Sequence, residues 1–142
     1  MTIILYILNV RFAGDIHFSK DVDESLENVR VPSMILQPIV ENAVNHGIRD
    51  IEWEGKIHLT VTGDADYIRI SVKDNGKGMT PEQIEGVLSG NKEYRKEEGD
   101  STGIGMNNVI SRLELYYEEK GLVEIRSDGL DRGTEVIVYI PV

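Results

Sequence analysis

The chain has 142 residues, with 25 acidic and 15 basic side chains and a formal net charge of −10 at pH 7. This length fits one domain, and an apolar fraction of 40% is ordinary for a globular protein. The absence of cysteine excludes disulfides, thiol catalysis and zinc–thiolate sites. The acidic balance argues against a nucleic-acid surface, because counterion release needs clustered Lys and Arg.

The first residues form a short apolar run, Ile-Ile-Leu-Tyr-Ile-Leu at 3–8. It is far shorter than the ~20 residues of a membrane-spanning helix. No basic stretch precedes it and no small-residue cleavage site follows it, so we expect no signal peptide. We expect a buried strand or helix end here, and a chain that opens on such a run resembles a segment of a longer protein.

The first half of the chain alternates between strand and helix patterns. Residues 16–22 predict a short strand, and residues 31–46 are apolar and long enough for a helix. Pro38 should kink that helix or mark an irregular start. Residues 56–62 and 67–73 alternate apolar and polar side chains around a short turn, which predicts an antiparallel hairpin.

The next helix has a recognisable beginning. Thr80 is a favourable N-cap, a proline follows it, and Gln83 completes a capping box. This helix is predicted to end near Ser89. Residues 90–101 are polar and bounded by glycine, and we expect a mobile loop there.

The last third predicts one more helix and two strands. The apolar face of the helix is formed by Met106, Val109, Ile110, Leu113 and Tyr117. Gly121 is the expected C′ stop of this helix, and strands follow at 123–125 and 134–140. The predicted fold is an α/β (α+β) two-layer sandwich. It has a mixed, mostly antiparallel sheet of about five strands, with about three helices on one face.

Residues 74–78, Asp-Asn-Gly-Lys-Gly, directly follow a predicted strand. The carboxylate of Asp74 is suited to accept a hydrogen bond from an exocyclic amine. Gly76 and Gly78 would remove side chains where a flat ring approaches the backbone. The same pattern also describes many tight turns, so an ordinary turn remains an alternative.

Three polar residues share one face of the first predicted helix: Asn42, Asn45 and His46 stand at i, i+3 and i+4. Three interpretations are open: the residues are core polar groups with hydrogen-bond partners, they cap the helix end, or they are part of a site. The carbonyl oxygen of Asn42 is a suitable hard ligand for Mg²⁺, which keeps most of its waters and bridges to phosphates.

Two further glycine motifs allow a functional or a purely structural interpretation. The segment 101–106, Ser-Thr-Gly-Ile-Gly-Met, opens a helix whose backbone N–H groups could meet an anion. It is otherwise a glycine-rich helix entry without a ligand. Gly133 and Thr134 are a turn glycine and a β-favouring residue, or they bring a hydroxyl near Asp74.

Four segments in this order resemble a known family: 37–47, 74–79, 103–108 and 133–134. They are similar to the N, G1, G2 and terminal Gly-Thr boxes of the ATP-binding catalytic domain (HATPase_c, GHKL or Bergerat fold) of sensor histidine kinases. The first box, with Tyr6, Arg11 and Phe12 upstream, most resembles the LytS/YesM-like branch.

The resemblance implies two regions. Residues 1–14 would be the tail of the dimerisation and phosphoacceptor helix region, and residues 15–142 would be the catalytic domain. The domain would bind Mg-ATP and donate the γ-phosphoryl group to a histidine on a separate dimerisation domain. The implied partners are that domain within a homodimer and a response regulator, with no nucleic acid. The implied location is the cytoplasmic side of a bacterial membrane sensor kinase.

The resemblance also assigns site residues. Asn42 would ligate Mg²⁺ and, with Glu41, is a catalytic candidate, while Asp74 would accept from the adenine amino group. Residues 80–102 would form a lid over the nucleotide. The other implied ATP contacts are Asn45, His46, Gly76, Gly78, Met79, Thr102, Gly103, Ile104, Gly105, Met106 and Thr134. Candidate phosphate contacts in the lid are Lys92, Arg95 and Lys96.

Several features leave alternatives open. Pro38 stands where related ATPases often carry Glu or Asn, and Asn45 stands where many kinases carry Lys or Arg. Hydrolysis without a partner is therefore expected to be slow. The chain has three histidines, and none of them lies in a predicted dimerisation helix: they are His17, His46 and His58. The alternatives are an ATP-sensing module without transfer activity, or another ATPase or serine kinase of the same superfamily.

Overall fold

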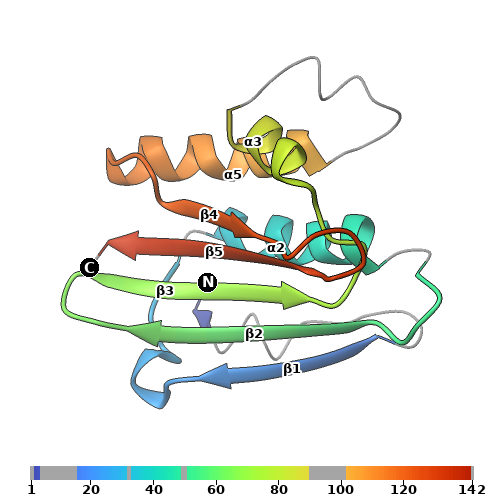
Figure 1. Cartoon of the computed structure of the whole chain (residues 1–142). Helices are drawn as coiled ribbons and strands as arrows, with labels where there is room; N and C mark the ends of the chain where they lie inside the picture. The colour runs from blue at the N-terminus through green and yellow to red at the C-terminus, as the bar shows by residue number, and fades with distance from the viewer. Residues whose placement is uncertain (1, 4–15, 32, 49–50, 90–101, 142) are drawn as a thin grey trace.

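A computed structural model describes residues 2–3, 16–31, 33–48, 51–89 and 102–141. Its centre is a five-stranded sheet in the order β1-β2-β3-β5-β4 (Figure 1). β1 pairs in parallel with β2, and the other neighbouring strands pair antiparallel. The strands are β1 (His17–Val22), β2 (Lys56–Gly63), β3 (Tyr67–Asp74), β4 (Val123–Arg126) and β5 (Thr134–Pro141). The predicted mixed, mostly antiparallel sheet is confirmed.

The helices lie on one side of this sheet (Figure 1). α5 packs against both α2 and α3, and the segment after α2 packs against β3. The helices are α2 (Ser33–Asn42), the π-helix η2 (Ala43–Ile48), α3 (Pro81–Ser89) and α5 (Thr102–Tyr117). A short 3₁₀ turn, η1 (Glu24–Leu26), follows β1. The predicted two-layer arrangement is thus confirmed.

The hydrophobic core lies between the sheet and the helices. Alternate residues of β2, such as Leu59, are fully buried, as are the corresponding residues of β3, such as Ile70. From the helical layer, Met106, Val109 and Leu113 of α5 close the same cluster. Within the described residues, no helix combines the length and apolar character needed to cross a membrane.

The hairpin of β2 and β3 forms as predicted, but β3 pairs on its other side with β5 rather than with β4. β4 therefore lies at the edge of the sheet, beyond β5. This non-consecutive pairing brings the end of β3 beside the beginning of β5. Asp74 and Thr134 stand opposite each other in that register.

The first long helix does not start at Pro38, which was one of the two possibilities that the sequence left open. α2 runs through this proline from Ser33 to Asn42, so the helix does not begin there. The irregular part comes afterwards, where Ala43–Ile48 form a π-helix. A π-helical segment inserts an extra residue into the turn, and such segments often lie at functional sites. Here it carries Asn45 and His46, the second half of the N box.

The expected role of Gly121 as the C′ residue of the last helix was wrong. α5 ends at Tyr117, and Glu118 directly after it takes the left-handed conformation with φ 55°. Gly121, with φ 77°, lies in the connection that leads on to β4. A left-handed residue terminates many helices, and here a glutamate occupies that position instead of glycine.

Candidate functional site

Asp74 is the last residue of β3 and is buried, with 6% of its surface exposed. Its Oδ1 accepts hydrogen bonds from the backbone amides of Gly76 at 2.9 Å and of Thr134 at 3.3 Å. Burial raises the pKa of Asp74 to about 6, while these two bonds act in the opposite direction. The expected proximity of Thr134 to Asp74 is confirmed by the strand register.

Two buried side-chain oxygens in the described part of the chain lack any hydrogen-bond partner: Oδ1 of Asn42 and Oγ1 of Thr134. Buried polar atoms are nearly always paired, so each exception needs an explanation, such as a ligand, ion or water. Both atoms belong to residues that the sequence motifs single out. A polar ligand at the end of β3 would provide the missing partner of Thr134, and a ligand or cation beside the end of α2 would provide that of Asn42.

The glycines around Asp74 have a packing role as well as a conformational one. Gly78 has φ 71°, and a Cβ there would lie 2.0 Å from the backbone oxygen of Gly129. Gly133 has φ 77°, and a Cβ there would lie 2.2 Å from the backbone oxygen of Asp74. Side chains are excluded at both positions because two turns pack backbone to backbone. The sequence predicted that Gly78 makes room for a ligand. The structure shows that it also makes room for the backbone of Gly129.

Asn75 was missed by the sequence reasoning, although it stands inside the motif. Its side chain donates from Nδ2 to the carbonyl of Glu54 at 2.8 Å and accepts at Oδ1 from the amide of Lys56 at 2.7 Å. Its own carbonyl accepts from Nε1 of Trp53 at 2.6 Å. These bonds fasten the turn after Asp74 to the start of β2. The sequence did contain a signal for this role, because an asparagine side chain at a turn can both donate and accept hydrogen bonds.

The N box lies at the end of α2 and in the π-helix. Asn42 closes α2 with its oxygen buried, whereas Glu41 is exposed and accepts a hydrogen bond from Nε2 of Gln37 at 2.9 Å. Neighbouring helical residues point about 100° apart, so the two side chains occupy different faces. Asn45 and His46 belong to η2, and their side chains lie outside the described part.

The G2 box opens α5. Thr102, Gly103, Ile104 and Gly105 occupy its first turn, and their side chains are not among those described. The first amides of a helix have no partner within it and face outward toward any anion. Met106 is fully buried in the core, and Met79 is buried with 1% of its surface exposed.

The lid region begins with a well-formed helix. Thr80 and Gln83 exchange the predicted capping-box bonds, from the amide of Thr80 to Oε1 of Gln83 at 2.9 Å and from the amide of Gln83 to Oγ1 of Thr80 at 3.1 Å. α3 then ends at Ser89, as expected. The predicted loop 90–101, with Lys92, Arg95 and Lys96, lies outside the described residues.

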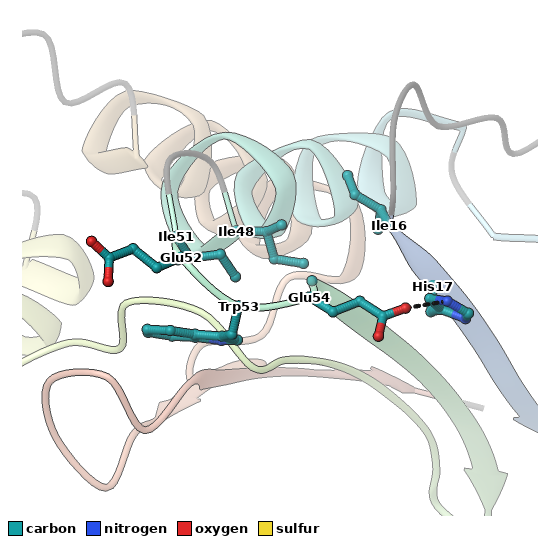
Figure 2. Close-up of a pocket in the computed structure, with 8 residues that line it drawn as sticks. Ile16, His17, Ile48, Ile51, Glu52, Trp53 and Glu54 are labelled. Atoms are coloured by element: carbon teal, nitrogen blue, oxygen red, sulfur yellow. Dashed lines mark ion pairs between the residues drawn. The ribbon is translucent and has the colours of Figure 1, made fainter.

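A separate hollow of about 820 Å³ lies beside the start of β1 and β2 (Figure 2). None of the predicted nucleotide contacts lines it. An ion pair between His17 and Glu54 forms one wall, and Trp53 forms another (Figure 2). Its connection to the candidate site is indirect, through the hydrogen bond from Trp53 to Asn75. The remaining lining residues are Ile16, Ile48, Ile51, Glu52 and Gly55.

The oxygen donors of the motif residues fit a weakly held cation better than a protein cage. In the part of the chain that the structure describes, no three His, Cys, Asp or Glu side chains gather as metal ligands. Magnesium commonly binds through one or two protein oxygens, its own waters and substrate phosphates. The unpartnered oxygen of Asn42 fits that mode of binding.

Two known proteins are similar in sequence to most of this chain. The sensor histidine kinase YpdA of Escherichia coli is 38% identical over 135 residues, which cover 92% of this chain and 21% of that protein. The sensor protein LytS of Bacillus subtilis is 30% identical over 131 residues, with the same two shares. The chain therefore spans about a fifth of the length of these relatives.

A solved structure supports the fold. The catalytic domain of the histidine kinase ThkA superposes with a TM-score of 0.65 at 25% identity, covering 89% of this chain and 79% of that one. A family model described as "Histidine kinase-, DNA gyrase B-, and HSP90-like ATPase" matches residues 29–142. The chain thus belongs to this HATPase_c family, and it is homologous to the catalytic domains of sensor histidine kinases.

Proposed function

We propose that this domain binds Mg-ATP and supplies the γ-phosphoryl group to a histidine on a separate dimerisation domain. One observation carries the binding part of the proposal. The two buried oxygens without partners, on Asn42 and Thr134, come from two different motif boxes. Buried Asp74 lies opposite Thr134 in the sheet register. A nucleotide offers both a cation-bound phosphate and a base edge to satisfy them.

Asp74 is the base-recognition residue of the proposal. Its Oδ1 is occupied by the amides of Gly76 and Thr134, so Oδ2 is the oxygen offered to the exocyclic amine of adenine. Guanine carries a carbonyl oxygen at the equivalent position, which would face the carboxylate and be repelled. The hydroxyl of Thr134 would back up Asp74 at the same base edge, directly or through water.

The phosphates would lie between the N box and the beginning of α5. The oxygen of Asn42 would hold Mg²⁺, and the ion would supply positive charge to the phosphates. The first amides of α5, around Gly103 and Gly105, would donate to phosphate oxygens. Asn45 and His46 would lie beside the nucleotide, and residues 80–102 would cover it.

Glu41 remains a catalytic candidate only by its place beside Asn42. Its carboxylate is exposed and bonded to Gln37, so a role as general base would require a different rotamer. Phosphoryl transfer needs little acid–base help from the protein, because positioning and charge stabilisation dominate its catalysis. The chemistry would therefore depend on Asn42 and the amides of α5.

The acceptor histidine belongs to the dimerisation domain in this proposal. Of the chain's own histidines, His17 pairs with Glu54, and His58 shares a hydrogen bond with Ser19 across β1 and β2. Residues 1–14 would be the tail of the dimerisation helix. The domain would work in a homodimer with a response regulator as phosphate acceptor, on the cytoplasmic side of a membrane sensor kinase.

Calorimetry with Mg-ATP tests the binding step. The wild-type domain should bind, and Asp74→Asn should lose roughly ten- to hundredfold in affinity, since a hydrogen bond to a charged group is lost. Trp53 is the single tryptophan, and its bond to Asn75 makes its fluorescence a second readout of the same turn. Exposed Asp21 of β1 provides the control Asp21→Asn, which should bind as the wild type does. Equal affinities of Asp74→Asn and wild type would contradict the assignment of Asp74.

An ATP-sensing module without transfer activity is the second candidate, favoured by Asn45, which cannot supply positive charge to a phosphate. Mixing the domain with its dimerisation domain and γ-labelled ATP distinguishes a kinase from a sensor by whether the label is transferred to protein. Acid-labile label on histidine supports the kinase. Acid-stable label on serine indicates a serine kinase, and ATP binding without label indicates the sensor.

A further inference from the structure

We propose that Ser127 is a positioning residue for base recognition, acting through the β4–β5 turn, residues 127–133. This inference rests on the proposed function, because it assumes that Asp74 and Thr134 meet the adenine. Neither the motifs nor the family boxes include Ser127.

The Ser127 hydroxyl joins three segments of the candidate site. It accepts hydrogen bonds from the amide of Met79 at 3.0 Å and from the amide of Gly129 at 3.2 Å. It donates to the carbonyl of Gly133 at 2.7 Å. One side chain thus connects the end of the Asp74 turn, the tip of the β4–β5 turn and the start of β5.

The bond to Gly133 reaches Asp74 through a single peptide group. The carbonyl of Gly133 belongs to the same peptide unit as the amide of Thr134, which donates to Oδ1 of Asp74 at 3.3 Å. Because a peptide unit is planar, the direction of its C=O determines the direction of its N–H. Ser127 therefore orients the group that holds the Asp74 carboxylate.

Other contacts show that this turn is clamped onto the Asp74 turn. The amide of Asp131 donates to the carbonyl of Lys77 at 2.7 Å, and the amide of Gly133 donates to the carbonyl of Gly76 at 3.1 Å. A Cβ on Gly78 would lie only 2.0 Å from the oxygen of Gly129. The two turns fit so closely that a shift of one must move the other.

Removing the hydroxyl would leave the amide of Met79 and the carbonyl of Gly133 without their present partner. Each would then turn toward water or another group, and the peptide before Thr134 would rotate with it. The carboxylate of Asp74 and the hydroxyl of Thr134 would no longer be held at their present angle. The loss of the hydroxyl should therefore weaken recognition of the base edge and leave the phosphate contacts unchanged.

Calorimetry with two nucleotides tests this role in the whole chain. Inosine triphosphate carries a carbonyl where ATP carries the amino group, so its binding does not use the Asp74 acceptor. We expect Ser127→Ala to weaken ATP by about tenfold, as for the loss of one positioned charge-assisted hydrogen bond, and inosine triphosphate by much less. The preference for ATP should therefore fall. Ser127→Thr, which keeps the hydroxyl, should restore it.

Ser71 of β3 offers a matched control. It is 2% exposed, and its hydroxyl bonds to Glu135. Ser71→Ala also removes a part-buried hydrogen bond of a serine hydroxyl, here between β3 and β5, and it should leave the ATP preference unchanged. If Ser127→Ala does not fold, Ser127→Cys, with a weaker donor and acceptor, should show the same loss of preference.

The outcomes separate the two proposals. No binding of ATP by the wild type would overturn the proposed function itself. Binding by the wild type, with the same ATP preference in Ser127→Ala or Ser127→Cys, would overturn the role of Ser127 alone. An equal loss of both nucleotides in Ser127→Ala and Ser71→Ala would mean that the hydroxyl only stabilises the fold, which also contradicts the inference.

Discussion

Asp74 places a carboxylate where an apolar or neutral group would be more favourable for folding. It is buried, and burial disfavours the charged form, so its pKa rises to about 6. The amides of Gly76 and Thr134 offset part of this cost. A buried charge with incomplete compensation is typical of functional sites, because its full complement of partners arrives with the ligand.

The raised pKa of Asp74 has a defined effect on stability. The usual Asp pKa of 3.8 applies to the unfolded chain and about 6 to the folded one, so between these values the folded state binds more protons. The contribution of Asp74 to the free energy of unfolding therefore decreases as the pH rises from about 4 to about 6. Above pH 6 the full cost of the buried charge is present.

Asp74→Asn removes that charge, and it should make the ligand-free domain more stable at pH 7.5. Each unit of pKa shift is worth about 1.4 kcal/mol, so we expect a gain of roughly 1–3 kcal/mol. At pH 4 the gain should disappear, because the wild-type carboxyl is then protonated. Urea unfolding at both pH values measures this, with Asp21→Asn as the control. A loss of stability at pH 7.5 would contradict the burial argument.

At the scale of elements, turns decide how the site is assembled. Gly133 and Gly121 have the same φ of 77°, and both belong to connections that lead into strands. Their surroundings differ: a Cβ on Gly133 would lie 2.2 Å from the oxygen of Asp74, whereas nothing lies within 4 Å of one on Gly121. Substituting each glycine in turn therefore distinguishes the cost of a left-handed backbone, present at both positions, from the cost of a steric clash, present only at Gly133.

We expect Gly121→Ala to lower the free energy of unfolding by roughly 1–2 kcal/mol, the cost of a left-handed residue with a Cβ. Gly133→Ala should cost that amount plus the displacement of the Asp74 backbone, in total about 3 kcal/mol or more. It should also abolish ATP binding, whereas Gly121→Ala should retain it. Denaturant unfolding and calorimetry of both variants measure the difference. Similar losses in the two variants would show that the close approach is not restrictive.

At the scale of the whole molecule, one sheet and one helical layer share a single core. α5 is central to it, because it contacts both α2 and α3 and directs Met106, Val109 and Leu113 inward. The same helix carries Leu115, which is 81% exposed, two residues after the fully buried Leu113. Both residues are leucines in the same helix, so the same substitution changes helix propensity equally at each. Any difference in the loss of stability then comes from packing.

Leu113→Ala should destabilise the domain by about 2–5 kcal/mol, the range for large-to-small changes in cores. Leu115→Ala should stay within about 0.5 kcal/mol of the wild type, as for most surface substitutions. Thermal or urea unfolding of the two variants provides the comparison. A large loss in Leu115→Ala would indicate that the exposed leucine packs against something in solution, such as a second copy.

Much of this arrangement could be predicted from local patterns. The alternation in β2 and β3, the Thr80–Gln83 capping box and the apolar face of α5 depend on neighbours close in sequence. The pairing of β3 with β5, the π-helix after Asn42 and the role of Ser127 could not be predicted in this way. The strand pairing and the bond of Ser127 to Met79 depend on contacts between residues far apart in the chain, which periodicity does not record.

The order of the four motif boxes in the sequence by itself determined the family and the identity of the base-recognition candidate, Asp74. Short-range chemistry was sufficient for this, because a carboxylate, glycines and helix caps act within a few residues. Only the tertiary structure decided that Asp74 is buried opposite Thr134 and that, among the described residues, Asn42 and Thr134 each keep a buried oxygen without a partner. It also decided that Ser127 joins the β4–β5 turn to the turn that follows Asp74. Burial and cross-strand register arise when distant segments pack, and packing sets the pKa and the orientation of the groups that meet a ligand.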